Sequence, residues 1–404
     1  MSADHLSVAL VGAAAPYQKT LATTLLSAGV LRQLVSFAPV LSIQEPDETG
    51  RLRVRKSFSG FSFARRIPWG LWRRVPGTLR PRPPVVGTVW AADRLVSRWI
   101  ASAKIFHGCT AVSLASLQAA KRKGATTFIE MAACHPRHWK KMDDQECRNF
   151  GARTYNSNGN LPERLIRRME SEFAICDHIV VPSAVAQKNF AEYGYGAKTL
   201  LLPTGVDAEF FFPSPVAVPQ TTFRVCYVGR LEFCKGVGYL LQAWKRLALA
   251  NAELLLIGER HPQMASMIRN CTDSSVRFTG FLPPAEVARC YRQSHLFVQP
   301  SPNEGLANVL LEAMASGLGI VATDRTGASE CITNGIEGFI IPACNLEVLM
   351  EAILWCYRHR AETEAMGKAA RVRIESQFTL EHYNQRVLTL YRKAAGHSGA
   401  PAGE

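Results

Sequence analysis

Short apolar segments alternate with helical patterns along the chain, and this alternation is the strongest constraint on its fold. In the first half, strands are expected at residues 6–12, 31–40, 103–107, 126–131, 178–182 and 200–203. In the second half, they are expected at residues 223–228, 253–257, 276–280, 295–299, 319–323 and 338–341. Repeated strand–helix–strand units are typical of doubly wound parallel sheets. We therefore predict an α/β protein with two Rossmann-like domains that face a cleft.

A segment rich in proline and turn residues, 203–219, separates the two series of strands, and we interpret it as a linker. This interpretation places the first Rossmann-like domain at residues 1–205 and the second at residues 220–375. Residues 376–395 predict a C-terminal helix that packs back on the first domain. Residues 396–404 are expected to form a disordered tail.

The composition excludes several classes of protein. No run of about 18 apolar residues is present, so no transmembrane helix is expected, and residues 1–5 lack the basic segment of a signal peptide. The 11 cysteines form no Cys-x-x-Cys pair, which favours free thiols in a reducing compartment. Cys134, His135, His138 and Cys147 lie close together, but their spacing matches no standard zinc motif. A cytoplasmic location is therefore expected.

Positive charge is concentrated in one part of the chain, which carries a formal net charge of +14. Residues 51–104, here called the basic stretch, hold thirteen basic residues, a single acid (Asp93) and four of the seven tryptophans. Such a stretch can be a solvated surface, a patch that docks on anionic lipid headgroups, or a nucleic-acid-binding surface. No nucleic-acid-binding module accompanies it. We therefore expect no nucleic acid as a partner and favour docking on a membrane surface.

Residues 228–236 follow a predicted strand and open a helix. Gly229 permits a tight turn, and a helix start offers N–H groups with a partial positive charge. The Arg230 guanidinium can hold two phosphate oxygens, and Lys235 adds a second positive charge. The segment predicts a diphosphate site. A helix-start turn with surface charges is the alternative.

Residues 300–317 contain two glutamates eight positions apart, Glu304 and Glu312. In a continuous helix their Cα atoms would be about 12 Å apart, whereas a retaining glycosidase needs its carboxyl groups about 5–5.5 Å apart. The spacing instead suits the two ends of one long ligand, with a sugar near Glu304 and a ribose near Glu312. The N–H groups of Leu306 and Ala307 could meet phosphate or sugar oxygens. The alternative for each glutamate alone is a surface charge.

These two segments carry a family resemblance. Residues 225–236 and 298–340 resemble the C-terminal half of the retaining glycosyltransferases of family 4, which have the GT-B fold. The two glutamates match the family's Glu-x7-Glu pattern, and Arg230 and Lys235 match its phosphate-binding basic pair. Residues 201–207, Leu-Leu-Pro-Thr-Gly-Val-Asp, resemble its Pro-Asn-Gly-Val-Asp stretch. The resemblance implies that the first domain faces the acceptor and the second binds the nucleotide sugar.

The resemblance also implies a set of site residues. The donor site would consist of Gly229, Arg230, Lys235, Phe281, Glu304, Leu306, Ala307, Asn308 and Glu312. On the acceptor side, a histidine is expected after a strand, where His135 fits, with His107 as its competitor and Gly12 in the loop after the first strand. The catalytic set would be Glu304, His135, Arg230 and Lys235. His135 would hydrogen-bond the donor sugar or steady the charge at its anomeric carbon, and a structural histidine is the alternative.

The activity that the resemblance implies is transfer of a hexose, with retention of configuration, from a nucleotide diphosphate sugar. A glycolipid, a lipid-linked saccharide or a polysaccharide is the expected acceptor. The chain has no Asp-x-Asp motif, so neither a metal nor another cofactor is expected. The alternatives are a GT-B-like sugar-nucleotide epimerase or phosphorylase, and a sugar-nucleotide-binding protein without catalysis.

Overall fold

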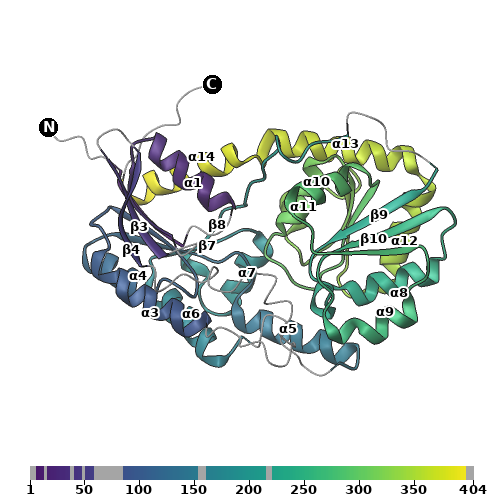
Figure 1. Ribbon diagram of the computed structural model, residues 1–404, viewed down its shortest axis with the longest axis horizontal. Helices are drawn as coiled ribbons and strands as arrows, with labels where there is room; N and C mark the ends of the chain where they lie inside the picture. The colour runs from purple at the N-terminus through teal and green to yellow at the C-terminus, as the bar shows by residue number, and fades with distance from the viewer. Residues whose placement is uncertain are drawn as a thin grey trace. The chain divides into compact units, whose positions relative to one another are not determined.

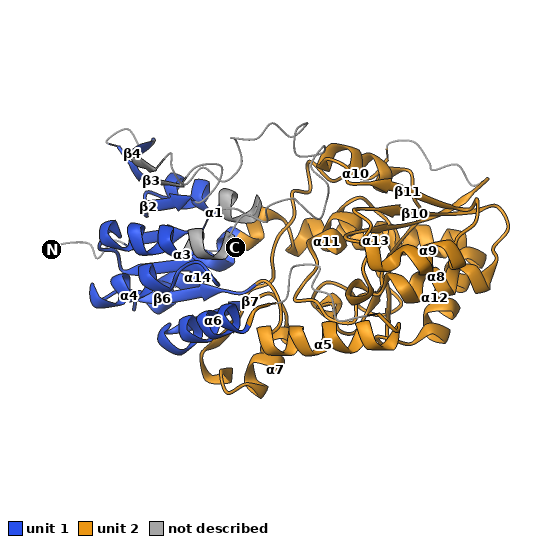
Figure 2. Ribbon diagram, turned by 60° about the horizontal axis from the view of Figure 1, so that its bottom comes forward, with its two compact units in different colours: residues 1–131, 163–180, 384–404 blue, residues 132–162, 181–383 orange. Residues whose placement is uncertain are grey.

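The computed structural model describes residues 6–12, 16–36, 41–47, 51–58, 85–152, 161–214 and 221–396 (Figure 1). The chain divides into two compact units (Figure 2). Unit 1 consists of residues 1–131, 163–180 and 384–404, and unit 2 consists of residues 132–162 and 181–383. Parts of three predictions lie outside the described residues: 59–84 of the basic stretch, 215–219 of the expected linker, and 397–404 of the expected tail.

The sheet of the N-terminal half has the strand order β4-β3-β2-β1-β5-β6-β7-β8. Its strands are β1 (Val8–Val11), β2 (Leu31–Ser36), β3 (Leu41–Pro46), β4 (Leu52–Phe58), β5 (Ile105–Cys109), β6 (Thr126–Glu130), β7 (His178–Val181) and β8 (Thr199–Leu201). The pairs from β2 through β1, β5 and β6 to β7 are parallel, as predicted. The pairs β2–β3 and β3–β4 are antiparallel, so the sheet is mixed.

The β3–β4 hairpin corrects the expectation of a wholly parallel sheet. The Asp47 carboxylate supports its turn, because it accepts the Arg51 N–H at 3.0 Å and pairs with Arg53 Nε at 2.5 Å. Arg53 and Arg55 on β4 are exposed, and charged side chains on an edge strand oppose pairing with another chain. In the sequence, the arginines of residues 51–58 indicated only a charged surface, and for this reason no strand was predicted there.

The helices of unit 1 cover its sheet. They are α1 (Pro16–Ser27), α3 (Val85–Val96), α4 (Leu114–Arg122), α6 (Glu163–Ile175) and most of α14 (Leu380–Ala394), with the 3-10 turn η2 (Ser97–Trp99). From α14, Asn384 donates a hydrogen bond to Thr24 on α1 at 2.8 Å.

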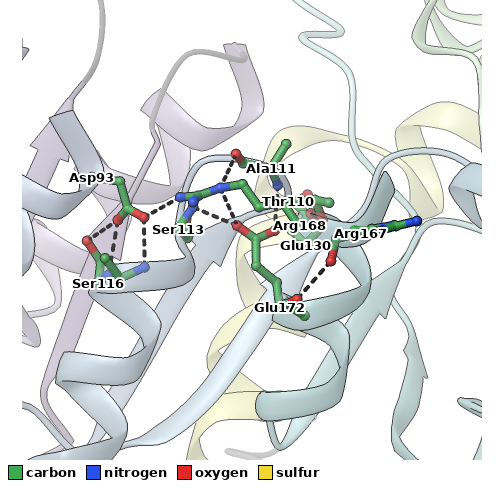
Figure 3. A network of polar contacts seen from close by, with 11 residues as sticks. Asp93, Thr110, Ala111, Ser113, Ser116, Glu130, Arg167, Arg168 and Glu172 are labelled. Carbon is green, nitrogen blue, oxygen red and sulfur yellow. Dashed lines mark hydrogen bonds and ion pairs between the residues drawn. The ribbon is translucent and has the colours of Figure 1, made fainter. Parts of the chain in front are cut away.

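An ion-pair network joins α3, α4 and α6 around Arg168 (Figure 3). Arg168 pairs with Asp93 at 2.5 Å and lies 3.8 Å from Glu172. Asp93 also accepts the N–H of Ser116 at 3.0 Å, and Glu172 accepts that of Ser113 at 2.9 Å. Neither carboxylate side chain is exposed. Burial raises the pKa of Glu172 to about 8, so Asp93 is the carboxylate that depends on Arg168 for a counter-charge at neutral pH. Asp93, the single acid of the basic stretch, therefore ties α3 to α4.

The sheet of unit 2 is parallel throughout, with the order β11-β10-β9-β12-β13-β14. Its strands are β9 (Phe223–Val228), β10 (Ala252–Ile257), β11 (Val276–Gly280), β12 (Leu296–Gln299), β13 (Gly319–Thr323) and β14 (Gly338–Ile341). All six predictions are confirmed to within one residue. Strands covered on both faces are nearly continuous apolar runs, which is why their ends were visible in the sequence.

The helices of unit 2 are α5 (Pro136–Asn149), α7 (Ala184–Glu192), α8 (Val237–Leu247), α9 (Ala265–Cys271), α10 (Pro284–Arg292), α11 (Asn308–Ala315), α12 (Leu346–Arg358) and α13 (Arg360–Gln377). Short 3-10 turns lie at η3 (Gly196–Lys198), η4 (Phe233–Lys235), η5 (Pro262–Met264) and η6 (Ala328–Glu330). Across the described residues of both units, every helix is too short or too polar to cross a bilayer.

Candidate active site

The strand order of the second sheet reverses at β9 and β12, which are hydrogen-bonded neighbours. In open α/β sheets, ligands bind beyond the carboxyl ends of the strands at such a switch point. Residues 229–236 follow β9, and residues 300–307 follow β12. The two segments that the sequence singled out therefore meet at one edge of this sheet.

Gly236 allows these two segments to approach each other closely. Its φ of +72° lies in the left-handed region, and a Cβ at this position would stand 2.0 Å from the Pro300 carbonyl oxygen. Any other residue would push the loop after β9 away from the loop after β12. Because α8 begins at Val237, immediately after Gly236, Lys235 lies at the entrance of that helix.

Lys235 and Glu304 form an ion pair across the two segments. Lys235 Nζ lies 2.5 Å from Glu304 Oε1, and each side chain is only 19% exposed. Burial alone would lower the pKa of Lys235, but the charge and hydrogen bond of Glu304 outweigh burial and raise it. Ser301 supports the pair, since its hydroxyl donates to the Lys235 carbonyl oxygen at 3.3 Å. Lys235 is therefore a fixed cation at the switch point.

Arg230 occupies the same loop but is more accessible. Its Nη1 lies 3.2 Å from Glu232 Oε1, and its side chain is 34% exposed, whereas Glu232 is almost fully buried. The Tyr227 hydroxyl donates to the Arg230 carbonyl oxygen at 3.0 Å and steadies the backbone there. A Cβ at Gly229, whose φ is +151°, would stand 2.7 Å from that hydroxyl oxygen. The tight turn expected at Gly229 is confirmed.

Asp143 is a site residue that the sequence analysis missed. It lies on α5, which packs against η4 through a stack of Phe150 on Phe233 with ring centroids 4.7 Å apart. Asp143 is two helical turns before Phe150, so it shares the face of α5 that meets this loop. Burial raises the pKa of Asp143 to about 7, and Lys235 opposes that rise while Glu232 and Glu304 add to it. Its carboxyl group therefore changes charge near neutral pH beside Lys235.

Glu312 lies on α11, eight residues after Glu304. The Tyr291 hydroxyl donates to Glu312 Oε2 at 3.3 Å. Burial raises the pKa of Glu312 to about 7, and the hydrogen bond from Tyr291 opposes the rise. The two glutamates thus differ in environment, because Glu304 has a cationic partner and Glu312 has a phenol.

The other predicted donor residues differ in accessibility. Leu306 is 5% exposed, Ala307 caps α11, and Asn308 is exposed. Asn308 Oδ1 accepts a hydrogen bond from the Thr204 hydroxyl at 3.3 Å, which links the resembling stretch 201–207 to the start of α11. Phe281, in the loop after β11, is 73% exposed. An aromatic ring so open to solvent is available to stack on a flat ligand group.

The loop after β6 packs against the loop after β12. A Cβ at Gly305 would stand 2.3 Å from the Ala132 carbonyl oxygen, and Cys134 Sγ lies 3.5 Å from the Glu304 carbonyl oxygen. These contacts with the loop after β6 add to those with the loop after β9, and together they hold the backbone at Glu304 in place.

His135 lies in that loop and is fully buried. Its ring stacks on Tyr193 with ring centroids 4.1 Å apart, and its Nδ1 accepts the Arg137 N–H at 3.4 Å at the start of α5. Its own N–H donates to Asn189 Oδ1 at 2.9 Å. The structure thus assigns His135 a capping and packing role, and its expected contact with a donor sugar stays a prediction.

The remaining two acceptor-side candidates lie in unit 1. His107 is fully buried, with its Nδ1 at 2.6 Å from the Tyr391 hydroxyl and its Nε2 at 3.4 Å from Glu130 Oε2. Gly12 follows β1 with a φ of +115°, and a Cβ there would stand 2.7 Å from Cys109 Sγ.

Comparison with solved structures identifies the fold. Sucrose-phosphate synthase from Thermosynechococcus elongatus aligns over 98% of this chain and 100% of its own, with a TM-score of 0.70 and 19% identity. HepE from Anabaena, in a complex with UDP-glucose, aligns over 96% and 100%, with a TM-score of 0.64 and 15% identity. The chain is a GT-B protein, which agrees with its two α/β sheets.

Comparison with sequences shows which family part of the chain resembles. Residues 222–359 match the family model of the glycosyl transferases group 1. The D-inositol 3-phosphate glycosyltransferase of Kribbella flavida is 29% identical over 219 residues, which cover 49% of this chain and 51% of that protein. The chain spans about half the length of the curated relatives it matches.

Proposed function

We propose that the chain is a retaining glycosyltransferase that moves a hexose from a nucleotide diphosphate sugar to a saccharide-bearing acceptor. The observation that carries this proposal is the Lys235–Glu304 ion pair at the switch point of the second sheet. The family model that residues 222–359 match supports sugar transfer. The complex of HepE with UDP-glucose supports a nucleotide sugar as the donor for this fold.

The diphosphate of the donor would bind between Arg230 and Lys235. Each cation already has a carboxylate partner, Glu232 or Glu304, that holds it in position before the donor arrives. Preorganised charges stabilise a transition state without reorganisation at the moment of reaction. The donor would then replace those carboxylates as the partner of each cation. Glu312, at the far end of the site, would accept hydrogen bonds from the ribose hydroxyls.

The reaction that fits this site is a displacement on the front face of the sugar. The bond between the anomeric carbon and the diphosphate oxygen breaks, and its electron pair stays on the diphosphate. The acceptor hydroxyl oxygen bonds to the anomeric carbon from the same face, and its proton passes to the released diphosphate. Arg230 and Lys235 accelerate the step because the charge that they neutralise is larger in the transition state than in the bound donor.

A glycolipid, a lipid-linked saccharide or a polysaccharide is the proposed acceptor, with the enzyme acting at the cytoplasmic face of a membrane. Within the described part of the basic stretch, Arg53, Arg55, Arg94 and Arg98 are exposed. Clustered basic residues attract anionic lipid surfaces, and this attraction is screened by salt. Co-sedimentation with vesicles of phosphatidylglycerol at low salt tests the idea. Equal recovery in the supernatant with and without vesicles would disprove membrane docking and leave sugar transfer standing.

The activity itself is tested by incubation with UDP-, GDP- and ADP-sugars and a panel of saccharide acceptors. Release of the nucleoside diphosphate together with a glycosylated product of retained configuration supports the proposal. Isomerised donor without release of nucleotide would indicate an epimerase. Thermal stabilisation by a donor without any turnover, across the whole panel, would indicate a binding protein.

A further inference from the structure

A second cavity of unit 2 lies at the opposite edge of its sheet from the candidate active site. It has a volume of about 380 Å³, which is the size of a small-molecule site. His295, directly before β12, and Gly317, shortly before β13, line it. The donor segments instead follow the carboxyl ends of β9 and β12. Since each residue of a strand advances about 3.3 Å, the four residues of β12 separate the two sites by roughly 13 Å.

The lining of this cavity is mainly apolar, and most of its charged groups are cations. Arg360, Lys368 and Arg371 come from one face of α13, and Arg292 comes from the last turn of α10. Glu364 is the single carboxylate among the described lining residues. A concave surface with an excess of cations concentrates anionic ligands.

The cations have different local roles. Arg371 is structural, because its Nη1 donates to the carbonyl oxygens of residues 208, 211 and 315 and its Nε pairs with Glu375. Lys368 pairs with Glu364 at the rim at 2.8 Å. Arg292 lies over the Phe212 ring at 4.7 Å, and no ion pair is found for it among the described residues. Stacking engages the face of a guanidinium and leaves its in-plane N–H donors for two oxygens of a phosphate or a carboxylate.

Besides the cations, hydroxyl groups line the cavity, and their oxygens can accept hydrogen bonds from a ligand. Ser294, Ser316 and Thr363 line the cavity, and each donates its hydroxyl proton to a backbone carbonyl within its own unit. A hydroxyl whose proton is engaged still offers its oxygen as an acceptor. A ligand that suits these groups carries both hydroxyl donors and a phosphate.

We propose that this cavity binds a small phosphorylated polyol, of which a sugar phosphate is the simplest example. Arg292 and Lys368 would hold the phosphate, and the three hydroxyl oxygens would accept hydrogen bonds from the polyol. Tyr291 lines the cavity, and its hydroxyl donates a hydrogen bond to Glu312. A ligand in the cavity would therefore contact the ring of Tyr291, while the hydroxyl of the same ring contacts a residue of the predicted donor site. The proposal goes beyond sugar transfer and does not depend on it.

Calorimetric titration with glucose 6-phosphate tests the site, with UDP, GDP and ADP present in excess so that the donor site is occupied by whichever of them it binds. Saturable binding is expected, with at least about tenfold weaker binding in Arg292→Gln. Lys368→Gln, at an exposed position, is a second variant for which weaker binding is expected should Arg292→Gln fail to fold. The matched control is Lys245→Gln on the exposed face of α8, which should bind like the unmodified chain. Unphosphorylated glucose should not bind.

Three results would overturn the proposal. One is the absence of saturable binding of glucose 6-phosphate. Another is binding that the excess of these nucleotides abolishes, because the ligand would then occupy the donor site. The third is equal affinity in the unmodified chain and in folded Arg292→Gln and Lys368→Gln variants, each checked by circular dichroism. None of these results bears on transfer from a nucleotide sugar, which is measured separately.

Discussion

Lys235 Nζ and Glu304 Oε1 lie 2.5 Å apart although the two residues are separated by 69 positions in the sequence. The two residues do not belong to one helix or one strand, so local structure alone does not bring them together. The pair forms because β9 and β12 are neighbours in the sheet and because Gly236 lets the loops behind them touch. The cation of the proposed diphosphate site is therefore positioned by the topology of unit 2.

Replacement of Lys235 tests the proposed leaving-group stabilisation. Lys235→Ala removes a preorganised charge, so turnover of sugar transfer should fall by roughly 10²-fold or more. The readout is release of nucleoside diphosphate at saturating donor. The control is Lys245→Ala, because Lys245 is exposed on α8 and donates to the Asn270 carbonyl oxygen at 2.6 Å; this variant should keep the original rate. Near-normal transfer by Lys235→Ala would show that this assignment is wrong.

Asp143 should make donor binding weaken as the pH rises. Its pKa of about 7 means that the carboxyl group is neutral below pH 7 and negative above it. Ionisation adds negative charge beside Lys235, where the diphosphate would bind, so Asp143 opposes UDP binding above pH 7. Asp143→Asn should therefore bind UDP like the unmodified chain at pH 6 and more tightly than the unmodified chain at pH 8.5. Equal affinities of the two proteins at both pH values, measured by titration calorimetry, would contradict the role of Asp143.

Glu312 should have the opposite effect on donor binding. Burial raises its pKa to about 7, and only the ionised carboxylate can accept hydrogen bonds from both ribose hydroxyls. Affinity for UDP should therefore rise through pH 7 on account of Glu312, and Glu312→Gln should weaken binding by about 10-fold or more at pH 8. The unmodified chain should also prefer UDP over 2′-deoxy-UDP, and Glu312→Gln should lose that preference. An unchanged preference in the variant would place the ribose elsewhere.

Arg168 should stabilise unit 1 strongly. Arg168→Ala leaves the buried carboxylate of Asp93 without a cation, which costs about 3–5 kcal/mol in the free energy of unfolding. The neighbouring Arg167 provides a matched control, because it is 75% exposed and pairs with Glu163 on the surface of α6. Arg167→Ala should cost only about 0.3–0.5 kcal/mol. Urea denaturation followed by circular dichroism compares the two variants, and equal losses would refute the network's role.

Much of the second sheet could be predicted because its strands are apolar on both faces. The bounds of β9, β11, β13 and β14 match the predicted ranges. Helix α5 could not be predicted in the same way, because its sequence from Pro136 to Asn149 is dominated by charged and amide residues. Its buried residues are Pro136, Glu146 and Cys147, and of these only Cys147, together with Phe150 just beyond the helix end, gives an apolar signal on the face that carries Asp143.

The sequence by itself determined the order of the strands and helices in unit 2 and the two segments that carry the candidate site. Apolar periodicity and turn residues are local properties, so they can be read without knowledge of distant neighbours. The tertiary structure alone decided that Lys235 meets Glu304, that Asp143 joins them, and that His135 is buried beneath Tyr193. Burial and charge pairing depend on segments far apart in the chain, and they set which side chains remain available for chemistry.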